Sequence, residues 1–246
     1  MEVTWNPWHG CRKISEGCRN CYVYRADSKY DKDSSVVRKT AAFSLPLAKD
    51  RRGLYKYPSG TLFFTCFTSD FFIEEADGWR SEAWRIMKER SDCGFVFFTK
   101  RICRAEKCLP PDWGGGYPNV TVGCTVENRA AAESRMPPFR AMPAAKKIVV
   151  CAPLLEEVYL GDISGVDEVS AGGESGENAR PCDFSWVLNL REQALDAGAA
   201  FTFHQTGARL VKDGVLYKIP RAFQHSQAKK AGIDILADKK APSRRR

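Results

Sequence analysis

The sequence lacks any long hydrophobic run. No segment approaches the roughly 20 consecutive apolar residues that a helix needs to cross a bilayer. Trp5, Asn6 and Pro7 stand where a signal peptide would have its apolar stretch. Internal repeats and a clear linker are also missing. We therefore expect a cytoplasmic protein that folds as a single domain and has no membrane partner.

Cysteine, by contrast, is plentiful, and three of the ten cysteines lie in one short loop. Cys11, Cys18 and Cys21 follow a C-x6-C-x2-C spacing within WNPWHGCRKISEGCRNCY. Three thiolates are too few for a closed structural zinc site, which takes four ligands. They suit a [4Fe–4S] cluster in which three irons bind protein thiolates and the fourth iron stays open to another ligand. The alternative is a Cys3His zinc site completed by His9.

The remaining cysteines give little support to a second metal site. Cys66, Cys124 and Cys151 lie in apolar segments, where we expect buried core thiols. Cys103 and Cys108 share a loop at C-x4-C, but no two clear companions accompany them to complete a ligand set. The metal-binding hypothesis therefore stays with the first three cysteines.

Strand-like and helix-like segments alternate along most of the chain. Such alternation indicates an α/β fold with a parallel sheet, either open or closed into a barrel. The number of strand-like segments favours a complete or partial barrel. The expected strands cover residues 61–67, 94–99, 119–126, 146–152, 166–171 and 200–205; the expected helices cover 74–90, 128–136 and 183–197; a hairpin around Asp213–Gly214 covers 207–220.

Polar residues follow these strands at the ends where the chemistry of parallel α/β folds collects. Solvated loops are polar in any protein, so one such end would carry no information. Five ends with charged or hydrogen-bonding side chains around one rim favour an active site. The candidates are Ser69 and Asp70, Lys100 and Arg101, Glu127, Glu174 in a glycine-rich turn, and His204.

Five motifs occur in a fixed order: WNPWHGC with C-x2-CY, TSDFF, FTKR, NVTVGCTVEN and GGESGENARP. Together they resemble the phage-associated three-cysteine-motif proteins, which are distantly related to radical S-adenosylmethionine (SAM) enzymes. The resemblance covers the chain from Thr4 to about Gly207. It implies a partial (β/α) barrel of the radical-SAM type, with the cluster loop after the first strand.

The resemblance also implies cofactors and partners. Cys11, Cys18 and Cys21 would hold a [4Fe–4S] cluster, and S-adenosyl-L-methionine would chelate its fourth iron. One electron from a cellular donor would cleave the sulfonium, and the resulting 5′-deoxyadenosyl radical would abstract a hydrogen atom from the substrate. A separate three-cysteine-motif protein is the implied partner.

Several residue roles follow from the resemblance, with departures. Six residues rather than the usual three separate the first two cysteines, and Tyr22 follows the third cysteine where an aromatic residue usually precedes it. Ser69 and Asp70 are the candidates for the methionyl amine, and Glu127 for the ribose hydroxyls. The glycine-glycine-glutamate run comes late in the chain, so Glu174 is instead a catalytic candidate, together with Lys100 and His204. Arg180 either pairs with Glu174 or binds substrate.

The charge favours a polyanionic partner. The net charge is +8, and the segment 238–246, DKKAPSRRR, contributes +4. We expect residues 1–220 to form the α/β domain and 221–246 a basic extension that is disordered at its end, either merely solvated or in contact with nucleic acid. The leading hypothesis is a radical SAM enzyme that modifies a nucleic acid or nucleotide. The alternative is a non-catalytic zinc or iron–sulfur protein that binds nucleic acid.

Overall fold

The computed structural model describes residues 1–236, which divide into two compact units. The first unit comprises residues 1–125 and 134–147; the second comprises 126–133 and the chain from residue 148 onward. Each unit is described by itself. The predicted disorder at the end of the basic tail, residues 237–246, lies outside the described residues.

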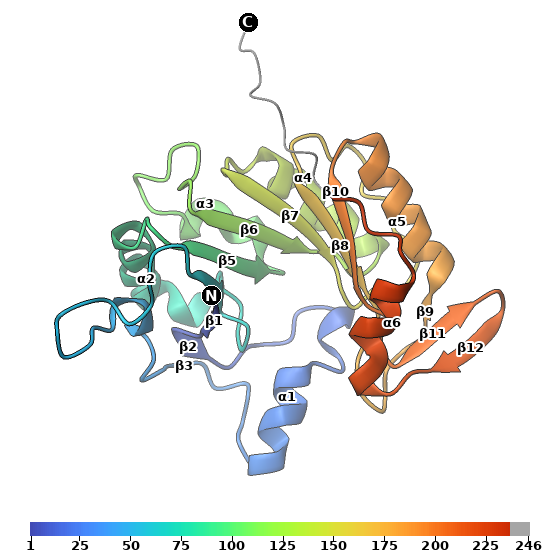
Figure 1. The fold of residues 1–246 in the computed structure, drawn as a ribbon, viewed down its shortest axis with the longest axis horizontal. Coiled ribbons are helices and arrows are strands. Elements are labelled where there is room, and N and C mark those ends of the chain that lie inside the picture. Colours follow the sequence, from blue (N-terminus) through green and yellow to red (C-terminus); the bar gives the residue numbers. More distant parts are fainter. Residues whose placement is uncertain (237–246) are drawn as a thin grey trace, which may run out of the picture. The chain divides into compact units, whose positions relative to one another are not determined.

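The first unit contains four parallel strands in the order β1-β4-β5-β6 (Figure 1). The register places Phe63 opposite Phe95, and Phe97 opposite Val122. The side chains of Phe63, Phe95, Phe97 and Val122 are fully buried, as expected for apolar strands covered by helices. The four strands are β1 (Glu2–Trp5), β4 (Leu62–Thr65), β5 (Gly94–Thr99) and β6 (Val120–Thr125).

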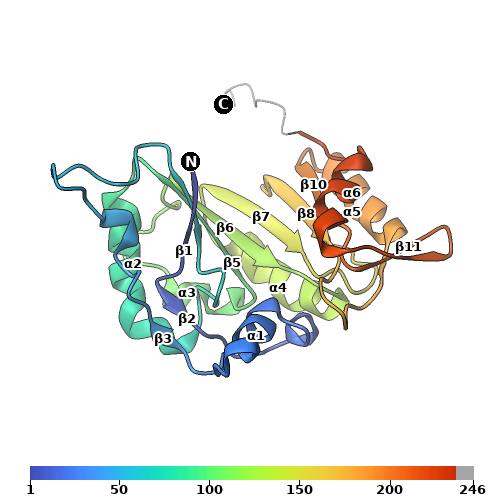
Figure 2. The same cartoon turned by 60° about the horizontal axis from the view of Figure 1, so that its bottom comes forward.

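Helix α2 (Asp77–Glu89) lies against the sheet of the first unit (Figure 2), and aromatic side chains pack it against β5. The Trp84 ring meets Phe97 edge-on at 5.8 Å between centroids, and Phe71 stacks on Phe97 at 4.4 Å. This cluster fixes the carboxyl end of β5, where site candidates begin. The smaller elements are β2 (Trp8–His9), β3 (Arg38–Lys39), α1 (Tyr22–Asp27) and α3 (Ala105–Cys108).

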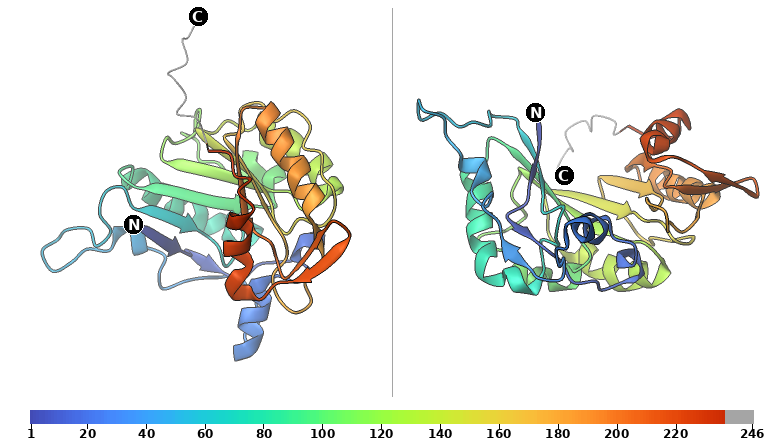
Figure 3. Two further views of the ribbon diagram at one scale, coloured as in Figure 1. Left: turned by 45° about the vertical axis from the view of Figure 1, so that its right-hand side comes forward. Right: turned by 90° about the horizontal axis from the view of Figure 1, so that it is seen from below.

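The second unit also has parallel strands, in the order β7-β8-β10. Helix α5 (Phe184–Asp196) begins at Asp183, whose carboxylate accepts a hydrogen bond from the Ser185 amide at 2.8 Å. Both α5 and α6 (Gln224–Lys230) pack against β10 (Figure 3). The strands are β7 (Lys146–Cys151), β8 (Glu168–Gly172) and β10 (Ala200–Gln205), with a small second sheet of β9 (Cys182–Asp183), β11 (Arg209–Lys212) and β12 (Val215–Lys218).

The predicted α/β class with parallel strands is confirmed in both units. The hairpin is confirmed too, because Asp213 and Gly214 both adopt the positive φ of a tight turn between β11 and β12. Helix α4 (Arg129–Ala141) is longer than predicted and continues through Pro137 and Pro138. Closure into a partial barrel of the radical-SAM type stays a prediction. None of the helices in residues 1–236 combines the length and apolarity that a membrane crossing requires.

Candidate functional site

The three cysteines of the N-terminal loop lie between β2 and α1 in the first unit. A short 3-10 helix, Glu16–Cys18, ends at the second cysteine, and Cys21 precedes the first residue of α1. The amide of Cys21 donates to the Cys18 carbonyl at 3.3 Å, which places these two residues one turn apart. All three thiols are free and half-buried. The loop therefore presents its sulfur atoms without a disulfide.

Hydrogen bonds attach this loop to the residues that follow β4. The Gly10 amide donates to the Thr68 carbonyl at 3.1 Å, and the Ser69 hydroxyl donates to the Gly10 carbonyl. Gly10 has φ +93, and a Cβ there would overlap the Val36 carbonyl, so only glycine fits. The Ser69 hydroxyl therefore lies beside the cysteine loop. Its role toward a cofactor stays a prediction.

Asp70 organises the ends of β4 and β5. Asp70 is only 5% exposed. One carboxylate oxygen accepts hydrogen bonds from the Thr99 hydroxyl at 2.7 Å and the Phe72 amide at 2.9 Å; the other accepts from the Lys100 amide at 2.8 Å. The Arg101 guanidinium completes the set at 3.3 Å. Asp70 thus holds its neighbours in place, and its predicted contact with a cofactor stays untested.

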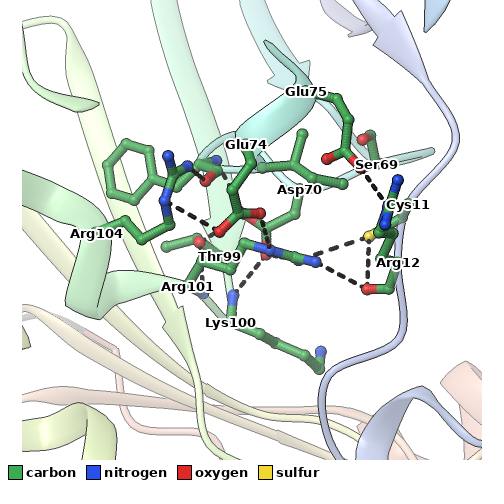
Figure 4. Close-up of polar contacts among 12 residues, drawn as sticks. Cys11, Arg12, Ser69, Asp70, Glu74, Glu75, Thr99, Lys100, Arg101 and Arg104 are labelled. Carbon is green, nitrogen blue, oxygen red and sulfur yellow. Dashed lines mark hydrogen bonds and ion pairs between the residues drawn. The ribbon is translucent and has the colours of Figure 1, made fainter. Parts of the chain in front are cut away.

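Arg101 connects this carboxylate to the cysteine loop (Figure 4). Its guanidinium lies 3.7 Å from the Cys11 sulfur and donates to the Arg12 carbonyl at 2.9 Å. It also lies 3.3 Å from Glu74. Burial and the Asp70 charge raise the pKa of the Cys11 thiol to about 12, and the Arg101 cation opposes that rise. A bound cation that replaced the thiol proton would remove this penalty.

Two tyrosines complete the first unit's cluster. The Tyr22 hydroxyl donates to the Phe67 carbonyl at the end of β4, and the Tyr24 hydroxyl donates to the Cys11 carbonyl. Tyr22 is a predicted cofactor-binding residue near the adenine, and that role stays a prediction. The support that Tyr24 gives to the first cysteine was not predicted. In Figure 4 the Lys100 side chain points away from the Asp70 contacts, and no hydrogen bond or ion pair to its ammonium group occurs within residues 1–236.

The ligand atoms of the cysteine loop are of the type that an iron–sulfur cluster requires. Three free thiols share one loop, and the Thr68 hydroxyl beside it is buried without any hydrogen-bond partner within residues 1–236. A buried hydroxyl is rarely left unpaired unless a further group binds there. In this conformation the described residues contain no group of three or more His, Cys, Asp or Glu side chains arranged to hold a metal ion. The thiols would therefore have to converge when a cluster binds.

His9, the fourth ligand of the zinc alternative, has a partner of its own. Its Nε2 lies 2.7 Å from Asp27, which also accepts from the Ser34 hydroxyl. The two hydrogen bonds lower the pKa of the Asp27 carboxyl against the opposing effect of burial. One ring nitrogen of His9 is therefore occupied, and the other remains for a ligand.

The second unit holds the other predicted candidates. The buried carboxylate of Glu174 forms a bidentate pair with Arg180, at 2.9 and 2.6 Å, and accepts the Arg180 amide as well. This settles that the two residues pair. The His204 ring lies 3.0 Å from the Ser170 hydroxyl, and burial lowers its pKa to about 4. Glu127 is fully buried.

The predicted residues thus lie in both units. The cysteine loop, Tyr22, Ser69, Asp70 and the Lys100 amide belong to one connected network in the first unit. Glu127, Glu174 and His204 belong to the second unit. The contact of Arg101 with Cys11, and the ion pair of Arg101 with Glu74, were not predicted; the only signal in the sequence was two successive cations after a buried strand.

Comparison with known protein families gives one match. The family model described as "Protein of unknown function (DUF5131)" matches residues 1–239. Comparisons with curated proteins and with solved structures gave no significant match. Because the family description assigns no activity, the functional argument has to come from the site.

Proposed function

The chain belongs to the DUF5131 family, and we propose that it is a radical SAM enzyme that holds a [4Fe–4S] cluster on Cys11, Cys18 and Cys21. One observation carries the proposal: three free thiols share a single loop that is hydrogen-bonded to the carboxyl end of β4. A set of three thiolates leaves one iron of such a cluster available to a small molecule. S-adenosyl-L-methionine is the cofactor proposed for that position.

The chemistry that this pair of cofactors supplies when bound is reductive cleavage of the sulfonium and abstraction of a hydrogen atom from the substrate. The residues of the chain would bind and orient the two cofactors. Arg101 places a cation beside Cys11, which favours the thiolate form that metal binding requires. Asp70 fixes Arg101, while the Thr68 and Ser69 hydroxyls stand at the strand end beside the loop.

The remaining parts of the proposal rest on the family resemblance and on charge. A cellular electron donor and a three-cysteine-motif partner protein come from the resemblance. The substrate, a nucleic acid or nucleotide, comes from the net charge of +8. Glu127 as a ribose contact, and Glu174, Lys100 and His204 as catalytic groups, belong to the same proposal.

A zinc site is the second candidate, and one observation favours it. A zinc-bound histidine commonly donates its other ring nitrogen to a carboxylate, and His9 is paired in this way with Asp27 at 2.7 Å. The function would then be non-catalytic binding of nucleic acid.

Metal analysis of protein purified without oxygen distinguishes the iron–sulfur site from the zinc site. A cluster predicts about four irons and four sulfides per chain, lost in Cys11→Ala, Cys18→Ala and Cys21→Ala. Cys103→Ala is the matched control, because that thiol is exposed and outside the loop. Reduced, cluster-loaded protein should release 5′-deoxyadenosine from S-adenosylmethionine. Stoichiometric zinc that disappears in His9→Ala would instead establish the zinc site. If the electron-spin signal of the loaded cluster does not change when S-adenosylmethionine is added, the radical SAM proposal is excluded.

A further inference from the structure

The second unit contains an open groove that no predicted site residue lines. Residues of the β11–β12 hairpin, α6 and the start of α5 line it, and its volume is about 570 Å³. Pockets of this size hold small organic ligands or a few monomers of a polymer. Phe203 and Leu210 line it as buried residues, whereas Tyr217 and Phe223 are 47% and 54% exposed.

The charge of the groove is entirely positive. Lys212, Lys218 and Lys230 line it, and no acidic residue does. The Lys212 ammonium lies 5.4 Å from the centre of the Phe184 ring. Within residues 1–236, neither Lys218 nor Lys230 forms an ion pair or a hydrogen bond through its ammonium group. Residues 206–236 contain six lysines and arginines against two aspartates. The groove therefore complements a polyanion.

Exposed aromatic rings beside unpaired lysines match one class of polyanion in particular. Base faces stack on aromatic side chains, and phosphates pair with the neighbouring ammonium groups. In a duplex both faces of each base are already stacked, so these rings would be reached only by unpaired bases. An acidic peptide would use the lysines but would leave Tyr217 and Phe223 without a role.

We propose that this groove binds single-stranded nucleic acid, with bases against Tyr217 and Phe223 and phosphates against Lys212, Lys218 and Lys230. The inference is independent of the proposed radical chemistry, because binding here requires no cluster.

The test measures binding of the full chain to fluorescent single strands of about twelve nucleotides, of DNA and of RNA. Tyr217→Ala combined with Phe223→Ala should weaken binding about tenfold or more. Changing Lys212, Lys218 and Lys230 together to Gln should reduce the log–log salt slope by about 2. The matched controls are Tyr159→Ala, an exposed ring of the same unit, and Gln at Lys29, Lys49 and Lys56, which are exposed lysines outside the groove.

Thermal unfolding of each variant verifies folding, which truncation of exposed side chains should leave intact. The segment 237–246 is the same in every protein compared, so its contribution cancels. Equal losses in the groove variants and in the controls would overturn the proposal. So would a duplex that binds as tightly as the strand, or a polyglutamate peptide that displaces the strand at lower concentration. A chain with Cys11, Cys18 and Cys21 all changed to Ser should bind the strand as the unaltered chain does, whatever the fate of the cluster proposal.

Discussion

The Arg101 guanidinium lies 3.3 Å from the Asp70 carboxylate, and the two residues are 7% and 5% exposed. This buried ion pair joins the end of β5 to the end of β4, and through Arg101 it reaches the Cys11 sulfur. A buried pair of opposite charges adds little stability by itself, because both ions have lost water. The pair instead holds the ends of β4 and β5 together. If either partner were removed, the other would be left as a buried charge without its counter-ion.

Arg101→Gln should lower the free energy of unfolding by about 3 kcal/mol, because the Asp70 carboxylate would stay buried without its counter-ion. Urea denaturation measures the change. The control is Arg12→Gln, whose side chain is 68% exposed and pairs with Glu75, and it should cost about 0.5 kcal/mol or less. Similar losses in both variants would show that the buried pair does not hold the strand ends together.

Gly207→Ala should be among the most destabilising single changes in the second unit. Gly207 has φ +74, and a Cβ there would lie 2.6 Å from the Gly173 carbonyl carbon and 2.7 Å from the Glu174 amide nitrogen. Gly198→Ala is the control that measures the cost of the positive φ alone, because Gly198 has φ +68 and open space around it, so its Cβ would overlap nothing. The control should cost about 1 kcal/mol, and Gly207→Ala at least twice that. Equal costs would mean that the backbone near Gly173 moves aside freely.

Glu174 and Arg180 should show strong energetic coupling. In a double-mutant cycle with Glu174→Gln and Arg180→Met, the coupling should reach about 1–3 kcal/mol, because a largely buried carboxylate meets a bidentate guanidinium. The exposed pair of Arg85 and Glu89, an i,i+4 contact on α2, should give about 0.5 kcal/mol or less in the same cycle. A coupling energy no larger than that of the exposed pair would show that the pairing of Glu174 with Arg180 does not stabilise the fold.

Local sequence signals predicted most of the regular elements. The strands over residues 94–99 and 200–205, the helix that begins at Asp183 and the Asp213–Gly214 hairpin all depend on patterns within a few residues. Helix α4 exceeded its prediction, because the sequence argument ended it before Pro137 while the chain continues to Ala141.

The contacts of the candidate site were mostly beyond sequence reasoning. Arg101 and Cys11 are 90 residues apart, and no pattern along the chain indicates that their side chains meet. Polar strand ends indicated Ser69, Asp70 and Lys100 as candidates, since parallel strands end at the same edge of a sheet, but they did not indicate which atoms contact the cysteine loop. Which atoms pair there depends on rotamers and loop paths. The sequence did not decide whether Arg180 pairs with Glu174 or binds substrate; the geometry shows the pair, and substrate binding stays a prediction.

His204 should make stability depend on pH between about 4 and 6.5. Burial, and to a lesser extent His225, lowers its folded pKa from 6.5 to about 4. The ring faces the Ser170 hydroxyl at 3.0 Å, and a Cβ at Gly172 would lie 2.5 Å from its Nε2. Between the two pKa values the unfolded chain binds a proton that the folded chain does not, so stability rises with pH and is lost as pH falls toward 4.

The expected loss across this window is on the order of 1–3 kcal/mol, allowing for partial exposure of the ring. Urea denaturation at a series of pH values measures it. His204→Asn should flatten the curve above pH 4.5, whereas His225→Asn, at an exposed position, should leave most of the slope. Carboxyl groups with lowered pKa values, such as those of Asp77 and Asp92, also contribute stability that the protein loses in acid. Their effect begins near pH 5, one unit above the unfolded carboxyl pKa of about 4, so it overlaps only the lower part of the histidine window. A slope between pH 5 and 6.5 that survives His204→Asn would assign it to another group.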